Sequence, residues 1–188
     1  MSDPADLTNL ADVKAWLSVP ATSVQDDPLL SRLITAASKY IQQWLNRTIA
    51  SASYTETRDG NGGFRLSFAN YPVTAVASLT IDDQPIPQST AVAAPGYVFS
   101  PTAISLRGGY QFTRDMQNVV VSYTAGFATT PSELAQACIE VISLRYRERD
   151  RIGVVSKGLA GETTAFSQKD FPASVMTILN NWKKVIPL

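Results

Sequence analysis

Apolar residues recur at intervals of three and four along three stretches of the chain, and this spacing predicts amphipathic helices. The longest stretch, Pro131–Arg151, carries two neighbouring apolar stripes and leaves only a narrow polar strip. We therefore expect it to pack on two sides, at the centre of a helical core. Pro28–Arg47 shows one continuous apolar stripe and Leu7–Leu17 a shorter one. These two helices are the expected partners of the long one.

Residues suited to capping stand near the start of each predicted helix. Thr129 or Thr130 precedes the longest helix, Asp27 precedes the second, and Thr8 or Asn9 stands at the start of the first. Side-chain oxygens of these residue types accept hydrogen bonds from the free N–H groups of a first helical turn. We expect one such residue to cap each helix.

Between the second and the longest predicted helix, apolar and polar residues alternate, which predicts strands of an antiparallel sheet. The expected strands are Ser53–Arg58, Phe64–Phe68, Val73–Ile81, Tyr97–Phe99, Ile104–Leu106 and Val119–Tyr123. The glycine-rich segment Asp59–Gly63 joins the first two, and its composition predicts a hairpin turn. Gln84–Gly96 is rich in proline, alanine and serine, which is typical of a long loop or an irregular edge.

The last part of the chain contains a predicted hinge, Gly153–Gly161, an extended segment, Glu162–Asp170, and a short helix, Ala173–Lys184. We expect it to leave the globule and contact a neighbouring molecule. The predicted fold class is α+β: a small helical bundle with an antiparallel β-sheet insertion between helices 2 and 3 and an extended C-terminal arm. The expected divisions are 1–50 and 128–160 for the helical core, 51–127 for the β insertion and 161–188 for the arm.

Composition narrows the class of protein. The 188 residues are 45% apolar and 17% charged, which is typical of a globular chain. Sixteen basic and sixteen acidic residues give no net charge, which argues against a free-standing nucleic-acid binder. No apolar run approaches the roughly 20 residues that cross a bilayer, so no membrane contact is expected. The acidic, polar N-terminus is unlike a signal peptide.

The residue types that carry most enzyme chemistry are missing. The chain has no histidine, which is the commonest general base and metal ligand. Its one cysteine, Cys138, lies on the apolar face of the longest predicted helix and is expected in the core. The motifs GxSxG, GxxxxGK[ST], GxGxxG and DxDxDG are absent. We therefore expect no enzyme activity, no metal and no cofactor.

Basic and aromatic residues near the end of the chain are the candidates for partner contact. The set consists of Arg145, Arg147, Arg149, Arg151, Phe166, Phe171, Pro172, Trp182, Lys183 and Lys184. The arginines suit an acidic partner surface or the DNA backbone, while cations at a helix C-terminus also offset its dipole. Trp182 beside two lysines suits an interface anchor. Trp16 and Trp44 occupy apolar helix positions and are expected in the core.

Five sequence segments, in chain order, carry a resemblance to a known family. They are LADVKAWLSV, DDPLLSRLITAASKYIQQWLNRTI, YPVTAVASLTID, VVVSYTAGFATTPSELAQACIEVISLRYRERD and FPASVMTILNNWKK. Together they resemble the head–tail connector (adaptor) proteins of tailed bacteriophages. The resemblance covers nearly the whole chain, although Ala91–Ser100 matches no pattern of the family.

The resemblance implies a structural protein of the virion neck, at the head–tail interface, made in the cytoplasm of a bacterial host. It implies a homo-oligomeric ring of about twelve subunits, through which double-stranded DNA passes without sequence-specific binding. The expected partners are the portal protein and a stopper or tail-completion protein. A neutral chain suits this role, because strong phosphate contacts would hold the moving DNA. The alternatives are a stopper or tail-completion protein, a carbohydrate- or ligand-binding module, and an enzyme without histidine.

Overall fold

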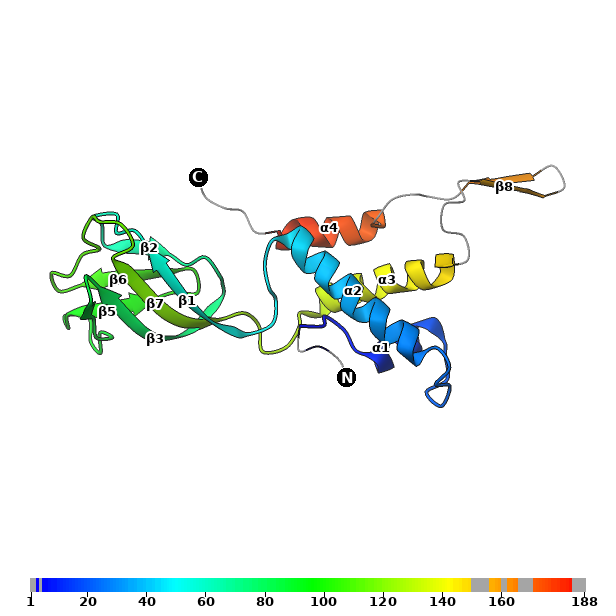
Figure 1. The fold of residues 1–188 in the computed structure, drawn as a ribbon, viewed down its shortest axis with the longest axis horizontal. Helices are drawn as coiled ribbons and strands as arrows, with labels where there is room; N and C mark the ends of the chain where they lie inside the picture. Colours follow the sequence, from blue (N-terminus) through cyan, green and yellow to red (C-terminus); the bar gives the residue numbers. More distant parts are fainter. Residues whose placement is uncertain (1–2, 4, 150–155, 160–161, 166–170, 184–188) are drawn as a thin grey trace. The chain divides into compact units, whose positions relative to one another are not determined.

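A computed structural model describes residues 3, 5–149, 156–159, 162–165 and 171–183, with the backbone alone at 156–159 and 162–165. The chain divides into two compact units. The helical unit contains Met1–Ile49 and Thr130–Leu188, and the β unit contains Ala50–Thr129 (Figure 1). The predicted α+β class and the sheet insertion between the second and third helices are confirmed.

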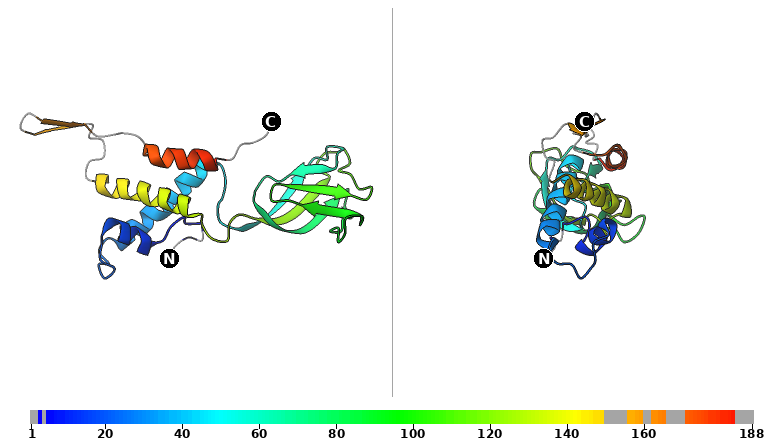
Figure 2. Two further views of the ribbon diagram at one scale, coloured as in Figure 1. Left: turned by 180° about the vertical axis from the view of Figure 1, so that it is seen from behind. Right: turned by 90° about the vertical axis from the view of Figure 1, so that its right-hand side faces the viewer.

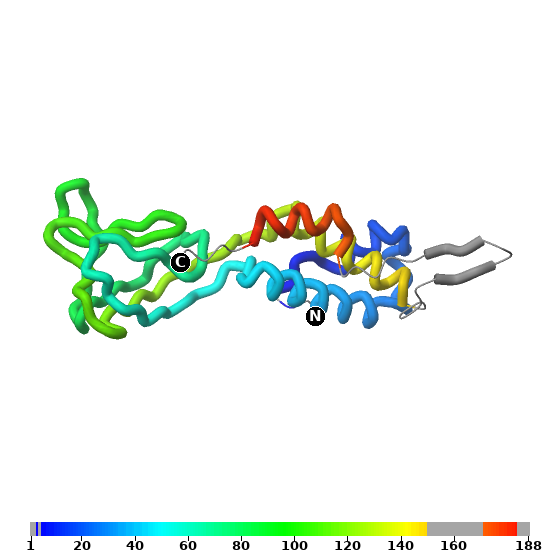
Figure 3. The backbone as a smooth tube through the Cα atoms, turned by 90° about the horizontal axis from the view of Figure 1, so that it is seen from above, coloured from blue at the N-terminus to red at the C-terminus, as the bar shows by residue number. Residues whose placement is uncertain are grey.

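The described part of the helical unit contains four helices (Figure 3). They are α1 (Leu10–Leu17), α2 (Asp27–Leu45), α3 (Ser132–Glu148) and α4 (Ala173–Trp182). The helix α3 contacts each of the other three, and both of its apolar stripes are buried, including Leu134, Ile139 and Ile142. The predicted central position of this helix is therefore confirmed. None of the described helices is long and apolar enough to span a membrane.

One of the three predicted helix caps, that of α1, is confirmed. Asn9 caps α1, since its Oδ1 accepts a hydrogen bond from the backbone N–H of Asp12 at 2.9 Å. The threonine cap expected for α3 is wrong, because Pro131 occupies the N-cap position and makes no side-chain bond there. The cap expected from Asp27 is also wrong, because this residue lies inside α2 and Asp26 precedes it. A carboxylate in the first turn still favours the helix through its dipole.

Cys138 and Trp16 were both expected in the core, but only one of them is buried. Cys138 is fully buried, as expected, and this burial raises the pKa of its thiol to about 11. The thiolate that carries cysteine reactivity is therefore scarce at neutral pH. Trp16 was expected in the core, but half of its surface is exposed. The other face of α1, with Val13 fully buried, contacts α2 and α3.

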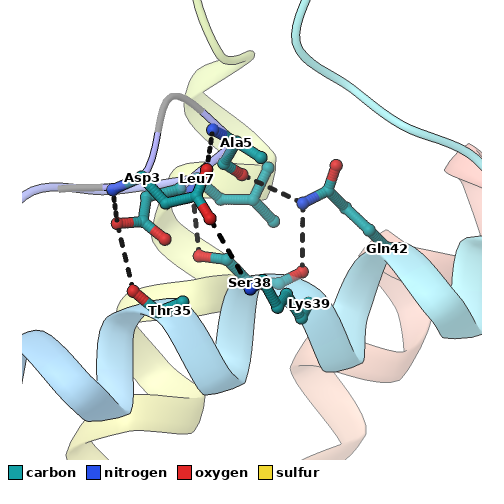
Figure 4. Close-up of polar contacts among 8 residues, drawn as sticks. Asp3, Ala5, Leu7, Thr35, Ser38, Lys39 and Gln42 are labelled. Atoms are coloured by element: carbon teal, nitrogen blue, oxygen red, sulfur yellow. Dashed lines mark hydrogen bonds and ion pairs between the residues drawn. The ribbon is translucent and has the colours of Figure 1, made fainter.

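The segment before α1 is tied to α2 by polar contacts (Figure 4). The backbone N–H of Leu7 donates to Ser38 Oγ at 2.9 Å. Gln42 Nε2 donates to the carbonyl of Ala5 at 2.9 Å, and its Oε1 accepts from the backbone N–H of Ile49 at 3.1 Å. One side chain of α2 thus holds both the N-terminal segment and the end of the connection that follows this helix.

The β unit consists of two antiparallel sheets around one core. The four-stranded sheet has the order β1 (Ala52–Arg58), β7 (Val119–Ala125), β3 (Val73–Ile81) and β4 (Gln84–Pro85). The three-stranded sheet has the order β2 (Arg65–Ser67), β6 (Ala103–Arg107) and β5 (Gly96–Phe99). Leu79, Val121 and Tyr123 of the first sheet share a hydrophobic cluster with Ile104 and Leu106 of the second. All six predicted strands exist.

The predicted hairpin at Asp59–Gly63 is wrong. The strand before it, β1, pairs with β7, and the strand after it, β2, pairs with β6, so the segment links two sheets. The backbone N–H of Gly60 donates to Asn118 Oδ1 at 2.8 Å. A Cβ atom at Gly60 would lie only 1.8 Å from the carbonyl oxygen of Thr113. The glycine is thus required for close approach to another loop, which a turn signal does not reveal.

A separate pair of strands, β8 (Ser156–Leu159) and β9 (Glu162–Ala165), is antiparallel. The prediction of an extended segment is confirmed over β9. The predicted hinge is wrong over β8, because these residues form a strand; the remainder of the hinge and of the extended segment lies outside the described residues.

A buried tyrosine connects three parts of the β unit. Tyr123, with only 1% of its surface exposed, donates its hydroxyl hydrogen to Glu56 Oε1. The same hydroxyl oxygen accepts a hydrogen bond from the backbone N–H of Asn70 at 3.1 Å. Burial, and secondly the bond to Glu56, raises the pKa of Tyr123 to about 12. The neutral phenol is therefore the form that stabilises the fold.

We expect Tyr123→Phe to lower the free energy of unfolding of the β unit by roughly 1–2 kcal/mol at neutral pH, because Glu56 loses its donor. The folded-state pKa is raised above 10, so this contribution is complete below pH 10 and is lost as the pH rises through about 12. Between these values the wild type should lose stability more steeply than the variant. Urea titrations followed by circular dichroism test this, with Tyr110→Phe as the control. Parallel pH profiles for wild type and Tyr123→Phe would contradict it.

Candidate partner interface

Three aromatic rings and two cations form a continuous row along α2 (the cation–aromatic row). The row consists of Arg145, Tyr40, Phe171, Trp44 and Lys183. Phe171 stacks on Tyr40 with ring centroids 4.9 Å apart and meets the edge of Trp44 at 6.3 Å. Arg145 lies 5.0 Å from the Tyr40 ring centroid, and Lys183 lies 4.9 Å from that of Trp44. Cations over aromatic faces are attracted by the ring quadrupole.

This row holds α4 against the rest of the helical unit, because Phe171 precedes α4 and Lys183 follows it. Val175 and Leu179 of α4 are fully buried. In Figure 2, α4 lies beside α2 and α3, both of which it contacts. The helix predicted as part of an extended arm is thus packed on its own unit.

Two hydrogen bonds fix the direction of α4 on α3. Ser174 Oγ, in the first turn of α4, donates to Glu140 Oε2 at 3.0 Å. Trp182 Nε1, in the last turn, donates to Glu133 Oε2 at 3.0 Å. Because the two glutamates stand seven residues apart, they lie on one face of α3. The two helices therefore run antiparallel, and each end of α4 has its own attachment.

The structure separates the predicted interface residues into groups. Arg145, Phe171 and Lys183 belong to the cation–aromatic row, and Phe171 is only 5% exposed. Arg149 lies 4.3 Å from the centroid of the Tyr146 ring. It also donates to the carbonyl of Tyr146 at 2.9 Å, as expected of a cation that offsets the dipole at a helix C-terminus. Each of these side chains has a contact inside its own unit.

Other predicted residues lie at or near the surface. Arg147 is exposed, as is Lys183 of the cation–aromatic row, and Pro172 and Trp182 are half-buried. Arg151, Phe166 and Lys184 lie outside the described residues. The exposed part of this set, at the C-terminal end of α3 and at the ends of α4, remains a predicted contact surface for a partner.

The sequence did not identify the surface of α2 and α3 against which α4 packs. Tyr40 and Trp44 stand four residues apart on α2, a spacing that places two rings on one helix face. The glutamates on α3 share a face in the same way. These spacings were the available signals, but nothing in them tells which later segment will cover that face.

Sequence reasoning also missed a nearly buried ion pair. Lys14 Nζ lies 2.6 Å from Asp27 Oδ1, and the side chains are 7% and 26% exposed. The pair joins α1 to the start of α2. A second contact of Lys14 Nζ, to the carbonyl of Ala21 at 3.3 Å, also reaches the connection between these helices.

The contacts described for the helical unit are ring stacking, cation–aromatic contacts, hydrogen bonds and ion pairs. Among the described residues, no group of three or more histidine, cysteine, aspartate or glutamate side chains could hold a metal ion. Glu133 and Glu140 accept hydrogen bonds from α4, and Asp27 is the ion-pair partner of Lys14.

Comparison with known proteins gives a family and a fold. The profile of the family described as Head completion protein matches residues 6–185. No curated protein matches the chain. A chain in the neck of an empty GTA particle, computed with C6 symmetry, has a TM-score of 0.61 and 21% identity, covering 95% of this chain and 90% of that one. A chain in the virion of a native gene transfer agent particle has a TM-score of 0.60 and 20% identity, covering 100% and 94%.

A third solved structure is the neck of a native GTA particle computed with C12 symmetry. Its chain has a TM-score of 0.58 and 21% identity, and the match covers 95% of this chain and 90% of that one. At this level of identity the three likenesses establish a shared fold across nearly the whole chain.

Proposed function

Because the chain belongs to the head completion protein family, we propose that it is a structural protein of a virion neck, an adaptor ring that joins the portal of the head to the tail. The single observation that carries the proposal is the family match over residues 6–185. It extends through both units, so the helical unit, the β insertion and α4 all belong to the matched protein type.

The likeness to neck proteins supports this position in the particle. The similar chains come from necks computed with C12 and C6 symmetry, and we propose a ring of about twelve copies on that basis. A ring of this kind leaves a central passage for double-stranded DNA. The chain has no net charge, which favours passage without tight phosphate binding.

The proposed partners are the portal protein above the ring and a stopper or tail-completion protein below it. The exposed Arg147 and Lys183, near the ends of α3 and α4, are the proposed contacts with an acidic partner surface. The role as a stopper is the second candidate, because the family description, head completion protein, does not distinguish it from an adaptor.

Particles assembled without this chain test the proposal. We expect heads that carry portals but no attached tails, because the adaptor that links them is missing. Electron microscopy of lysates counts tailed and tail-less particles, and supplying the wild-type chain in trans should restore tails. Tailed particles at the normal frequency in the absence of the chain would contradict the proposed function.

A further inference from the structure

The helix α1 is apolar on nearly every side, yet its own unit covers only part of it. Six of its eight residues are apolar, and a helix with this composition is normally buried all round. Of these six only Val13 is buried, and half of the surface of Trp16 is exposed. Val24, in the connection to α2, is 70% exposed. Trp16 and Val24 are the exposed large apolar side chains in the described part of the helical unit.

A surface hollow lies between this helix and the start of α2 (the α1 hollow). Its volume is about 550 Å³, and the ion pair of Lys14 and Asp27 forms part of its lining. The rest of the lining is apolar and consists of Leu10, Ala11, Ala15, Val19 and Ala21. A hollow with an apolar lining and few polar groups is the usual form of a binding site for an apolar anchor.

The surroundings of the α1 hollow are acidic. Residues 1–31 contain five aspartates and one lysine, which gives a formal charge of 1 − 5 = −4. Asp12 follows Ala11 on α1, and Asp26 precedes Asp27. Neither Asp12 nor Asp26 forms an ion pair with a cation among the described residues. A segment that fits the hollow therefore combines apolar side chains with a flanking cation.

The same chain carries the complementary charge in another part of its sequence. Residues 145–188 contain eight basic and four acidic residues, so their formal charge is 8 − 4 = +4, while residues 32–144 are balanced, 7 − 7 = 0. Within the described residues, no ion pair joins the acidic region to the basic one.

One short segment of the basic region has the composition that the α1 hollow requires. It is Lys184–Leu188, KVIPL (the tail segment), in which a cation is followed only by apolar residues. The exposed Lys183 precedes it and adds a second cation. By contrast, Arg145 and Arg149 already contact tyrosine rings of their own unit. The tail segment itself lies outside the described residues.

The α1 hollow of the same copy is too far away for the tail segment. Lys183 Nζ lies 4.9 Å from the centroid of the Trp44 ring, and Asp27 stands 44 − 27 = 17 residues before Trp44 on α2. At the rise of an α-helix this separation is roughly 25 Å. The five residues of the tail segment span at most about 18 Å when fully extended. The segment that enters the hollow must therefore come from another copy.

Resting on the proposed ring, we propose that the tail segment of one copy binds in the α1 hollow of the next copy. Its apolar residues fill the hollow, and Lys184 faces the aspartates beside it. The contact joins the region at the end of α2 in one copy to the region at the start of α2 in the next. Such a contact is heterologous, as the closure of a ring requires.

Cysteine cross-linking in assembled particles tests this contact. In the variant Ala15→Cys/Ile186→Cys, a short bis-maleimide should link successive copies into a ladder of multimers on a denaturing gel. Either single substitution should give no ladder, because a thiol in the hollow then faces no thiol in the tail segment. Val92→Cys/Ile186→Cys is the control, since Val92 is 87% exposed in the β unit. The native Cys138 is buried and does not compete.

Mixed particles show whether the link joins two copies. Particles assembled from Ala15→Cys copies together with Ile186→Cys copies should give dimers and no longer products, because each copy then has one reactive thiol. A link inside one copy would appear in the double variant as a monomer of altered mobility without a ladder. That result would contradict the proposed contact.

Two substitutions test the chemistry of the contact. Ala15→Arg places a cation where the tail segment brings its lysines, and Ile186→Glu places a charge among the apolar residues of that segment. Each should lower the yield of tailed particles roughly ten-fold or more, because like charges and unpaired charges at an interface are costly. Ala36→Arg is the matched control, since Ala36 is likewise an exposed helical alanine and does not line the hollow. The melting temperature of isolated Ala15→Arg should stay near that of wild type.

The outcomes separate this inference from the proposed function. If a ring is seen in the neck but the double-cysteine variant gives no ladder, the contact is wrong and the adaptor role stands. If Ala15→Arg lowers the yield whereas Ile186→Glu does not, a different protein covers the α1 hollow and the contact is again overturned. If the chain is absent from the neck, the proposed function fails and the contact fails with it.

Discussion

Phe171→Ala is expected to lower the free energy of unfolding of the helical unit by about 3–5 kcal/mol. The side chain is 5% exposed and lies between Tyr40 and Trp44. Removing it leaves a cavity and ends the stacking that holds the start of α4. The loss should also weaken the packing of Val175 and Leu179, because the start of α4 is then held by the Ser174–Glu140 hydrogen bond without the stacked ring.

Tryptophan fluorescence is a suitable probe for this variant, because the three tryptophans, Trp16, Trp44 and Trp182, all lie in the helical unit. Val24→Ala is the control in the same unit: Val24 is 70% exposed, so its removal should cost less than about 0.5 kcal/mol. A denaturation midpoint for Phe171→Ala equal to that of Val24→Ala would contradict the anchoring role of the cation–aromatic row.

Lys14→Met is expected to cost roughly 2–3 kcal/mol of stability. Methionine keeps the aliphatic length but leaves the Asp27 carboxylate without its partner at 2.6 Å. Breaking a fully buried pair costs about 3–5 kcal/mol. We expect less here, because Asp27 is 26% exposed and the pair borders a surface hollow of about 550 Å³. Water can therefore solvate the remaining carboxylate in part.

A second ion pair of the helical unit provides the control. Lys39 Nζ lies 3.5 Å from Asp3 Oδ2, and the side chains are 62% and 38% exposed. Exposed pairs contribute about 0–1 kcal/mol, so Lys39→Met should change stability little. Equal losses of unfolding free energy for Lys14→Met and Lys39→Met in urea denaturation would contradict the larger contribution expected of the buried pair.

The helices were predictable from the sequence because each carries its own periodic apolar stripe. Pro28–Arg47 was predicted and α2 spans Asp27–Leu45; Pro131–Arg151 was predicted and α3 spans Ser132–Glu148. The strands were predictable because apolar and polar residues alternate along them. A stripe, however, does not say which segment will cover it, and this explains why Trp16 was wrongly expected in the core.

Strand pairing was not predictable, because partners are chosen over long distances in the chain. β1 pairs with β7, so Tyr54 lies opposite Tyr123, and the local glycine signal at Asp59–Gly63 could not reveal this. The same limit applies to the interface residues. The sequence indicated Phe171 and Trp182 as candidates for contact with a partner molecule. In the structure they contact Tyr40 and Glu133 of their own chain.

The ring in the neck is the central claim, and image reconstruction of the particle neck without imposed symmetry tests it most directly. We predict about twelve copies of this chain in one ring, coaxial with the portal and in contact with it. A ring separated from the portal by another protein would assign the chain to the stopper position. Absence of the chain from the neck, or its presence as single copies elsewhere in the particle, would contradict the account.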